Sequence, residues 1–198
     1  MNLNKLKDRV HENAIKHSAW NGKKSMDEYF ALIHYEISLT LEVDINGYWF
    51  IKKECASYLF DWIEIKYDDN YIKDFLEGFR NNIKNTFEDK LADVVIRTLD
   101  LCGYYEIDID KIINKCEIDN LFKHAKSMAG KLLILHNLIT YAQTNDNGYR
   151  PGNGKEYDES SIVRIIMATL ELAKQLNINI EKHIKMSIRY NENKERSD

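Results

Sequence analysis

Acidic and basic side chains alternate along the segment "EDKLADVVIRTLDLCG" in a pattern that suits metal or phosphate chemistry. Lys90 and Arg97 lie on the same helix face as Asp93, because residues three or four apart on a helix are neighbours, and Asp100 continues that face. A further acid, Glu36, lies in "FALIHYEISLTLE". Acids on helices usually face solvent, but these lie among apolar residues. Carboxylates at this spacing on two facing helices can surround magnesium and the phosphates that it carries.

Only half of such a metal shell is present. Leu39 lies three residues after Glu36, and Lys90 lies three residues before Asp93, where further carboxylates would be needed. Leucine cannot coordinate magnesium and a lysine ammonium repels it, so magnesium is a doubtful cofactor, with Glu36 and Asp93 as its remaining candidate ligands. Lys90 could instead supply positive charge directly to a phosphate. The alternative is that Lys90 only pairs with Asp93, Glu36 or another neighbouring acid.

Other residues give weaker signals. Residues 48–79 are rich in aromatic side chains, which could stack on a base and its ribose but more often form core. His34 and His136 lie on apolar helix faces without the spacing of zinc ligands, and we expect them in the core. The glycine-rich stretch around Arg150 and Lys155 could close over phosphates, but it lacks a Walker sequence.

The composition sets limits on function. With 198 residues and 44% hydrophobic content, the chain can bury one core or two small, joined cores. A net charge of −4 argues against a dedicated nucleic-acid-binding protein, which needs clustered basic residues. No apolar run is long enough to cross a membrane, since His136 and Asn137 interrupt "KLLILHNLI". Three cysteines without metal-ligand spacing and a polar N-terminus without a signal peptide predict a cytoplasmic protein.

The elements that position these residues are expected to be helices. A single proline, few glycines and apolar residues at three- and four-residue spacing predict an all-α fold. Asp108 and Asn179 are predicted N-caps, because a short polar side chain can accept hydrogen bonds from the free amides of a first turn. The segment "TNDNGYRPGNGKEYDES" is predicted to join two helices of one bundle. The predicted helices cover residues 3–18, 26–43, 49–65, 70–84, 87–103, 109–124, 127–144, 158–176 and 179–193.

Two parts of the chain resemble each other. A shift of 71 positions aligns "KLADVVIRTLDLCGYYEIDIDKII" with "SIVRIIMATLELAKQLNINIEKHI" and matches Leu99 with Leu170. Upstream, "FALIHYEISLTLE" and "KLLILHNLITYAQ" are also similar, with His34 over His136. The pattern indicates a tandem duplication whose halves pack as a pseudo-dimer around one core. The alternative is that amphipathic helices look alike through their shared periodicity.

The stretches "HENAIKHSAWNGKKSMDEYFALIHYEISLTLE" and "NTFEDKLADVVIRTLDLCGYYEIDIDKI" resemble the MazG-like all-α nucleoside triphosphate pyrophosphatases, relatives of the dimeric dUTPases. The resemblance covers most of residues 11–124, and "NINIEKHIKMSIRYNENKER" is similar to a second copy of the family's closing helices. It implies a MazG-like helical bundle of two tandem units, residues 1–126 and 127–198, that assembles into homo-oligomers. In this family, ExxE on one helix and ExxD on another hold magnesium against the triphosphate while water attacks.

The sequence departs from the family pattern at half of the ligands. Glu36 and Asp93 match the first and fourth family carboxylates, but Leu39 and Lys90 replace the second and third. The second unit supplies no carboxylate set, because its corresponding positions hold Leu138, Tyr141, Ser161 and Arg164. A late basic stretch of the family is only partly kept, without its Arg-Pro pair. The resemblance therefore implies a nucleotide or phosphate site whose candidate residues are Lys90, Arg97, Glu36, Asp93, Asp100, Lys123 and Lys126.

Three functions follow as hypotheses. The favoured one is a MazG-like protein that binds or sequesters a small nucleotide or nucleotide-derived signal with impaired catalysis, in the cytoplasm of a bacterial cell or a phage-infected host, as an anti-defence sponge. The second is an active, magnesium-dependent pyrophosphohydrolase whose shell is rebuilt from Glu36, Glu42, Asp89, Asp93 and Asp100. The third is a scaffold or interaction protein without a small ligand.

Overall fold

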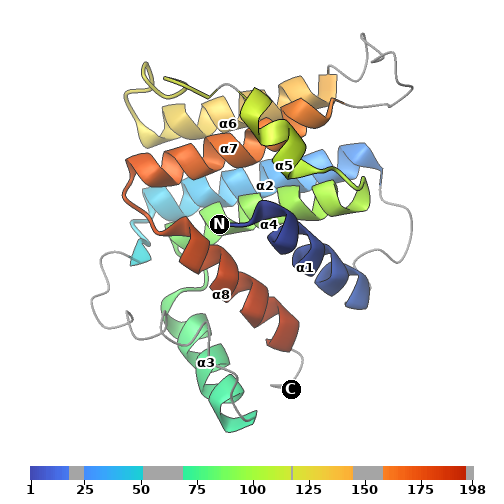
Figure 1. The fold of residues 1–198 in the computed structure, drawn as a ribbon. Coiled ribbons are helices and arrows are strands. Elements are labelled where there is room, and N and C mark those ends of the chain that lie inside the picture. The colour runs from blue at the N-terminus through green and yellow to red at the C-terminus, as the bar shows by residue number, and fades with distance from the viewer. Residues whose placement is uncertain (18–24, 51–68, 117, 145–157, 195–198) are drawn as a thin grey trace.

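The described part of the chain is built of helices (Figure 1). The computed structural model describes residues 1–17, 25–50, 69–116, 118–144 and 158–194, and no β-strand occurs among them. None of the helices in these ranges is both long and apolar enough to cross a bilayer. The helices are α1 (Leu3–Lys16), α2 (Met26–Ile45), α3 (Asp69–Asn82), α4 (Phe87–Tyr104), α5 (Ile109–Ile112), α6 (Met128–Thr144), α7 (Glu159–Gln175) and α8 (Ile180–Asn193). The all-α prediction is confirmed.

Most of the predicted helices match the structure to within a few residues, but one is wrong. The helix predicted at 109–124 is only the single turn of α5, followed by a 3₁₀ turn at Ile113–Lys115. Asn120 then adopts a φ of 59°, a left-handed conformation that asparagine tolerates but that a helix cannot contain. The helix predicted at 49–65 lies almost wholly outside the described residues.

The two predicted N-caps behave differently. The side chain of Asn179 accepts a hydrogen bond from the amide of Lys182 at 3.3 Å, which confirms it as the cap of α8. Asp108 precedes α5 but forms no capping hydrogen bond. Its carboxylate instead accepts from Asn4 Nδ2 at 3.0 Å and pairs with Lys111 Nζ at 2.7 Å. The carboxylate that was predicted to cap α5 therefore bonds to Asn4, a residue of α1 that is far away in the sequence.

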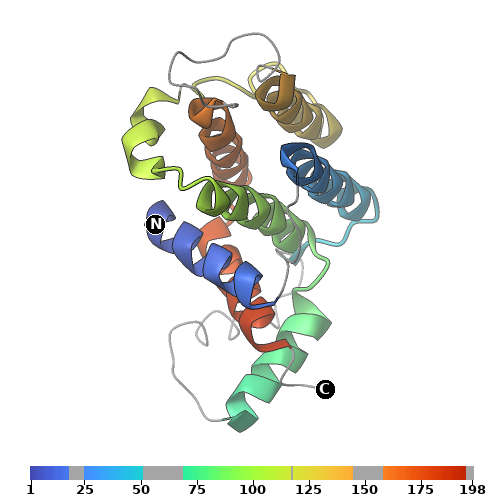
Figure 2. The same ribbon diagram turned by 90° about the vertical axis from the view of Figure 1, so that its right-hand side faces the viewer.

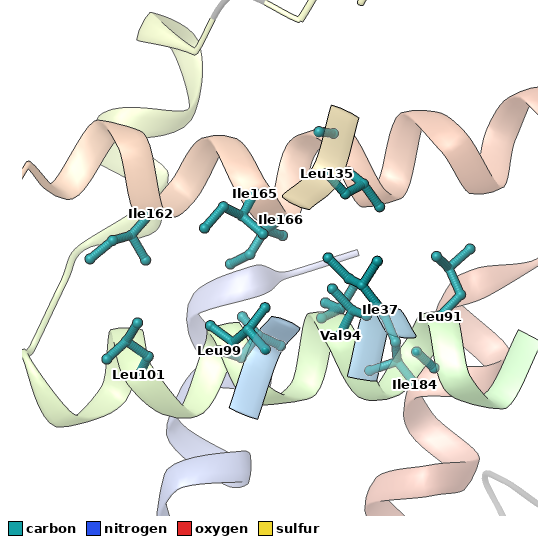
Figure 3. Packing of buried hydrophobic residues seen from close by; sticks show 14 of the residues in the cluster. Ile37, Leu91, Val94, Leu99, Leu101, Leu135, Ile162, Ile165, Ile166 and Ile184 are labelled. Carbon is teal, nitrogen blue, oxygen red and sulfur yellow. The ribbon is translucent and has the colours of Figure 1, made fainter. Parts of the chain in front are cut away.

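Four long helices form a closed bundle. Helix α2 packs on α4, α4 on α7, α7 on α6, and α6 on α2, so that each contacts two of the others (Figures 1 and 2). Aliphatic side chains from all four meet in the interior, among them Ile37, Val94, Leu135 and Ile165 (Figure 3). All four are fully buried. Burial of each such side chain contributes roughly 1.5–3 kcal/mol, which makes this core the main source of the bundle's stability.

The remaining helices extend the bundle, two of them directly against α4. Helices α1 and α8 both pack on α4, and α3 packs on α8 (Figure 2). The guanidinium of Arg9 in α1 donates two hydrogen bonds of 2.6 Å to the carboxylate of Glu192 in α8, which ties these helices together. A second apolar cluster, which includes Phe75, Phe79 and Met186, joins α3 to α8. Helix α4 is therefore at the centre of the fold.

The turns that end α4 and α7 have the same geometry. Glu106 and Asn177, which are 71 residues apart, both have positive φ, at 53° and 56°. In each turn the next amide reaches back to a carbonyl five residues earlier at 2.9 Å: Ile107 to Cys102, and Ile178 to Ala173. Such left-handed C-terminal turns satisfy carbonyls that the helix end leaves free.

Candidate functional site

A pocket of about 820 Å³ lies between α1, α2, α4 and α8. Helix periodicity explains which residues line it, because residues three or four apart on α2 and on α4 share the face that borders the pocket. Leu39 and Glu42 line the wall. The same wall holds five of the seven residues that the sequence proposed for a nucleotide or phosphate site, namely Glu36, Lys90, Asp93, Arg97 and Asp100.

Lys90 forms an ion pair inside this pocket. Its ammonium lies 3.1 Å from Asp93 Oδ2, one turn along α4, and its side chain is only 9% exposed. Lys84, which precedes α4, lies 3.7 Å from the same carboxylate oxygen. Burial lowers the pKa of Lys84, but the carboxylates of Asp93 and Asp89 outweigh it and leave the pKa raised. Two ammonium groups therefore converge on one carboxylate at this end of the pocket.

Asp89 supports this arrangement from behind the pocket wall. It is completely buried, and it accepts hydrogen bonds from the amide of Asn85 at 2.9 Å and the hydroxyl of Ser187 at 2.9 Å. Burial, together with the negative charge of Asp93, nevertheless raises the pKa of Asp89 to about 6. Desolvation disfavours the charged form more strongly than the hydrogen bonds and Lys84 favour it. Asp89 is thus a structural carboxylate that links α4 to α8.

Glu36 keeps one carboxylate oxygen without a partner. Its Oε1 accepts from Arg97 Nε at 3.3 Å, whereas its buried Oε2 has no hydrogen-bond partner in the part of the chain that the structure describes. Burial raises the pKa of Glu36, and the negative charge of Asp93 adds to the effect, although Arg97 and Lys90 lower the pKa. A buried acceptor without a donor is costly, so Glu36 offers a position for a donor from a ligand.

Asp100 lies where α1 packs against α4. Its Oδ1 lies 2.9 Å from His11 Nδ1. Nearby, Gly103 allows this approach, because a Cβ at that position would lie 2.5 Å from the Cβ of His11. Gly103, the last residue of the helix predicted at 87–103, therefore has a packing role against α1.

Three tyrosines line the same pocket. Tyr35 and Tyr48 are 57% and 60% exposed, as are few other large hydrophobic side chains of the described chain. Tyr190 from α8 stacks on Phe79 with ring centroids 4.6 Å apart, and Lys84 Nζ lies 5.9 Å from the Tyr190 ring centroid. The aromatic stretch 48–79 is thus divided: Tyr48 lines the pocket, Phe75 and Phe79 are core, and residues 51–68 lie outside the described residues.

Two predicted site residues lie elsewhere. Lys123 and Lys126 are exposed, in the turns before α6, and neither lines the pocket. The prediction relied on the likeness of "EIDNLFKHAK" to the family's late basic stretch, and such a likeness does not fix where these lysines lie in the fold. Lys123 and Lys126 therefore lie outside this pocket, and a binding role for them stays a prediction.

The sequence also missed several lining residues. Lys84 and Asn85 lie in the turn before α4, and Tyr190, Asn191 and Lys194 come from α8 or its C-terminal cap. The position of Lys84 two residues before the N-cap Thr86 was a usable signal, because it places the ammonium beside the acidic first turn of α4. No local pattern could indicate α8, whose position depends on packing across about 100 residues of chain.

The donor set at this pocket does not fit a magnesium ion. Magnesium needs near-octahedral oxygen ligands. No group of three or more His, Cys, Asp or Glu side chains in the described ranges could hold a metal ion. The acid that would have to serve, Asp93, is already paired with the ammonium of Lys90. A divalent ion placed there would face a fixed positive charge a few ångströms away.

No protein-family model, curated protein or solved structure matches this chain.

Proposed function

We propose that this chain is a MazG-like protein whose pocket binds a small nucleotide or nucleotide-derived signal without hydrolysing it. The observation that supports the proposal most is the composition of one pocket wall. Lys90 and Arg97 lie there with Glu36 and Asp93, the two acids that match the family's ligand positions. A pocket of about 820 Å³ is within the range of small-molecule and cofactor sites.

The paired helices support a tandem origin for residues 1–126 and 127–198. Helices α2 and α6 meet through equivalent residues, with His34 Nδ1 2.7 Å from His136 Nδ1 and the two rings stacked. In α4 and α7, Thr98 and Thr169 are equivalent, and each hydroxyl donates to the carbonyl four residues earlier at 2.8 Å. Self-contact of equivalent residues is the property of an isologous, two-fold interface. A pseudo-dimer accounts for these contacts and for the matched turns after α4 and α7.

Hydrolysis by a rebuilt carboxylate shell has less support. Of the acids available for such a shell, Asp89 is held by Asn85 and Ser187 behind the wall, and Asp100 is held by His11. Asp93 is paired with Lys90. Glu42 and the Oε2 atom of Glu36 remain, which is too few for the ion. A scaffold without a ligand would not need a pocket that gathers ammonium, guanidinium and carboxylate groups.

The first experiment is identification of the ligand by mass. The purified protein is incubated with a pool of nucleotides and of cyclic and ribose-linked signalling nucleotides in magnesium, washed and denatured, and the released molecules are weighed. Recovery of an intact nucleotide supports the proposal. Monophosphate and pyrophosphate in solution would instead indicate hydrolysis. Absence of any released nucleotide, with no shift in melting temperature, would favour the scaffold.

Sequestration is the biological role that we propose for such binding. A protein that holds a signalling nucleotide without turnover lowers its free concentration in proportion to the amount of protein. This role would suit the cytoplasm of a bacterium or of a phage-infected host. We further propose a homo-oligomer, with gel filtration coupled to light scattering as its test.

A further inference from the structure

The charges of the pocket cancel, and this limits what it can bind. Four carboxylates line it, from Glu36, Glu42, Asp93 and Asp100. The lysine and arginine side chains on its described wall are equal in number and come from Lys84, Lys90, Arg97 and Lys194, while His17, which also lines it, is counted as neutral. The described wall therefore carries no formal net charge, whereas a triphosphate site needs a strong positive excess or a bound divalent cation.

The inner cations are also already neutralised. Lys90 pairs with Asp93 at 3.1 Å, and Arg97 lies 3.3 Å from Glu36. Lys84 lies within 4 Å of both Asp89 and Asp93. A phosphate entering here shares these cations with the carboxylates and meets the like charge of the carboxylates. Each additional phosphate charge is therefore less well compensated than the one before.

Glu36 favours a ligand that carries a hydrogen-bond donor. Its side chain is 7% exposed, and its Oε2 has no partner within the described residues. This oxygen repels a phosphate, but it can accept a hydrogen bond from an N–H or O–H group. A ligand that fits the pocket brings such a donor, as a base amino group or a ribose hydroxyl does.

We propose, on the basis of the function proposed above, that the ligand is a metal-free nucleotide of low charge, a monophosphate or a phosphodiester-linked dinucleotide, and not a magnesium triphosphate. A phosphomonoester carries about −1.5 to −2 charges, a cyclic dinucleotide with its two diesters carries about −2, and a triphosphate carries about two more negative charges than either. The low-charge end of this series matches a pocket with paired cations and one unpaired acceptor. The family resemblance implies a preference for triphosphates, and the proposal for this chain is the opposite preference.

The test compares ligands that differ in phosphate charge. Binding to the full chain is measured by calorimetry in EDTA for AMP, GMP, CMP and UMP, for the corresponding triphosphates, and for cyclic di-AMP and cyclic di-GMP. We expect the best monophosphate or cyclic dinucleotide to bind at least about tenfold more tightly than the triphosphate of the same base, and magnesium not to reverse the order. A triphosphate that binds more tightly, with or without magnesium, would overturn the inference.

A variant separates the electrostatic cause from the overall fit. Glu36→Gln keeps the shape of the side chain and removes one charge that repels phosphate. It should therefore reduce the difference in affinity between the monophosphate and the triphosphate. Glu171→Gln, on α7 outside the pocket, is the matched control and should leave this difference unchanged. If Glu36→Gln is unstable, Asp93→Asn tests the same effect. If the difference in affinity is unchanged in the pocket variant, the inference is overturned. If no probe binds at all, the proposed function itself has failed.

Discussion

Lys90 is the residue whose charge most affects the proposed site, because its ammonium lies beside Asp93 on the pocket wall. We expect Lys90→Ala to weaken nucleotide binding about tenfold or more, since hydrogen bonds to charged groups contribute roughly 1.5–3 kcal/mol. Lys174→Ala is a control, because Lys174 also pairs with an acid one turn away but is 82% exposed on α7. Calorimetry with the ligand identified by mass measures both. Equal affinity of the two variants would contradict a role for Lys90.

The two substitutions that replace family carboxylates can be reversed. Leu39 and Lys90 line the same pocket as Glu36 and Asp93, so Leu39→Glu combined with Lys90→Glu would fill all four family ligand positions with carboxylates. We expect the double variant to gain affinity for magnesium or manganese that the wild type and the single variant Leu39→Glu lack. Calorimetric titration with each metal provides the measurement. No added metal affinity in a folded double variant would count against the alignment with the family.

Asp89 should make stability depend on pH. Its pKa is raised to about 6 by burial and by Asp93, so the folded chain holds this proton more tightly than the unfolded chain. Stability from this group is therefore greatest below a pH of about 4 and falls as pH rises through about 6. His183 acts in the opposite direction, because burial lowers its pKa to about 4. Only a comparison with a variant at each pH separates the two groups.

Asp89→Asn is that variant. Its amide can accept from the amide of Asn85 and donate to the hydroxyl of Ser187, which preserves the local hydrogen bonds. We expect the unfolding free energy of Asp89→Asn relative to wild type to increase between pH 4 and pH 7. Urea unfolding at a series of pH values measures it. A constant difference across this range would show that Asp89 does not titrate with the raised pKa.

At the scale of elements, the contact between α1 and α4 depends on one glycine. A Cβ at Gly103 would lie 2.5 Å from His11 Cβ, and the backbone of α1 would have to move away. We expect Gly103→Ala to lower the unfolding free energy by about 1–3 kcal/mol, the usual cost of overpacking. The same move would displace His11 from Asp100 and widen the pocket.

Gly130→Ala is the matched control for this prediction. Gly130 lies in the first turn of α6, where a Cβ would come no closer than 3.3 Å to Ser127 Oγ. We expect this change to be neutral or stabilising, since alanine is favoured over glycine in a helix by up to about 1 kcal/mol. Thermal and urea unfolding compare the two variants. Equal effects would mean that α1 does not approach α4 as closely as the structure has it.

At the scale of the whole molecule, His34 and His136 join α2 to α6 in the bundle. Their Nδ1 atoms are 2.7 Å apart, so one ring must donate and the other accept. Burial lowers the pKa of both, and His136 lowers that of His34 further, which keeps the rings neutral as the shared hydrogen bond requires. Protonation of both rings at low pH would remove the acceptor.

A double-mutant cycle tests this junction. We expect His34→Ala and His136→Ala to destabilise the protein by similar amounts, and the double variant to cost little more than either, because the two share one hydrogen bond worth about 0.5–1.5 kcal/mol. The coupling should weaken as pH falls through the pKa values of the rings. Urea unfolding at pH 7.5 and 5 gives the coupling energies. Additive effects at pH 7.5 would contradict a contact between α2 and α6 at these residues.

The sequence by itself determined the helical fold and much of one pocket wall. Apolar spacing placed most helices correctly, because burial of one face is a local, periodic requirement. The same periodicity put Lys90, Asp93, Arg97 and Asp100 on one face of α4, and the structure has all four on the pocket. These features depend on residues within two or three turns of each other, which a local pattern can specify.

Tertiary structure alone decided the rest of the site. Lys123 and Lys126 lie in the turns before α6, outside the pocket, and Asp108 failed as a cap because Asn4 occupies its carboxylate. The contribution of α8 was invisible because its side chains reach the pocket only after packing on α4 and α3. The unpaired oxygen of Glu36 likewise results from which partners the packed helices bring within reach. Such contacts join residues far apart in the chain, so they form and stabilise the protein only once the core has packed.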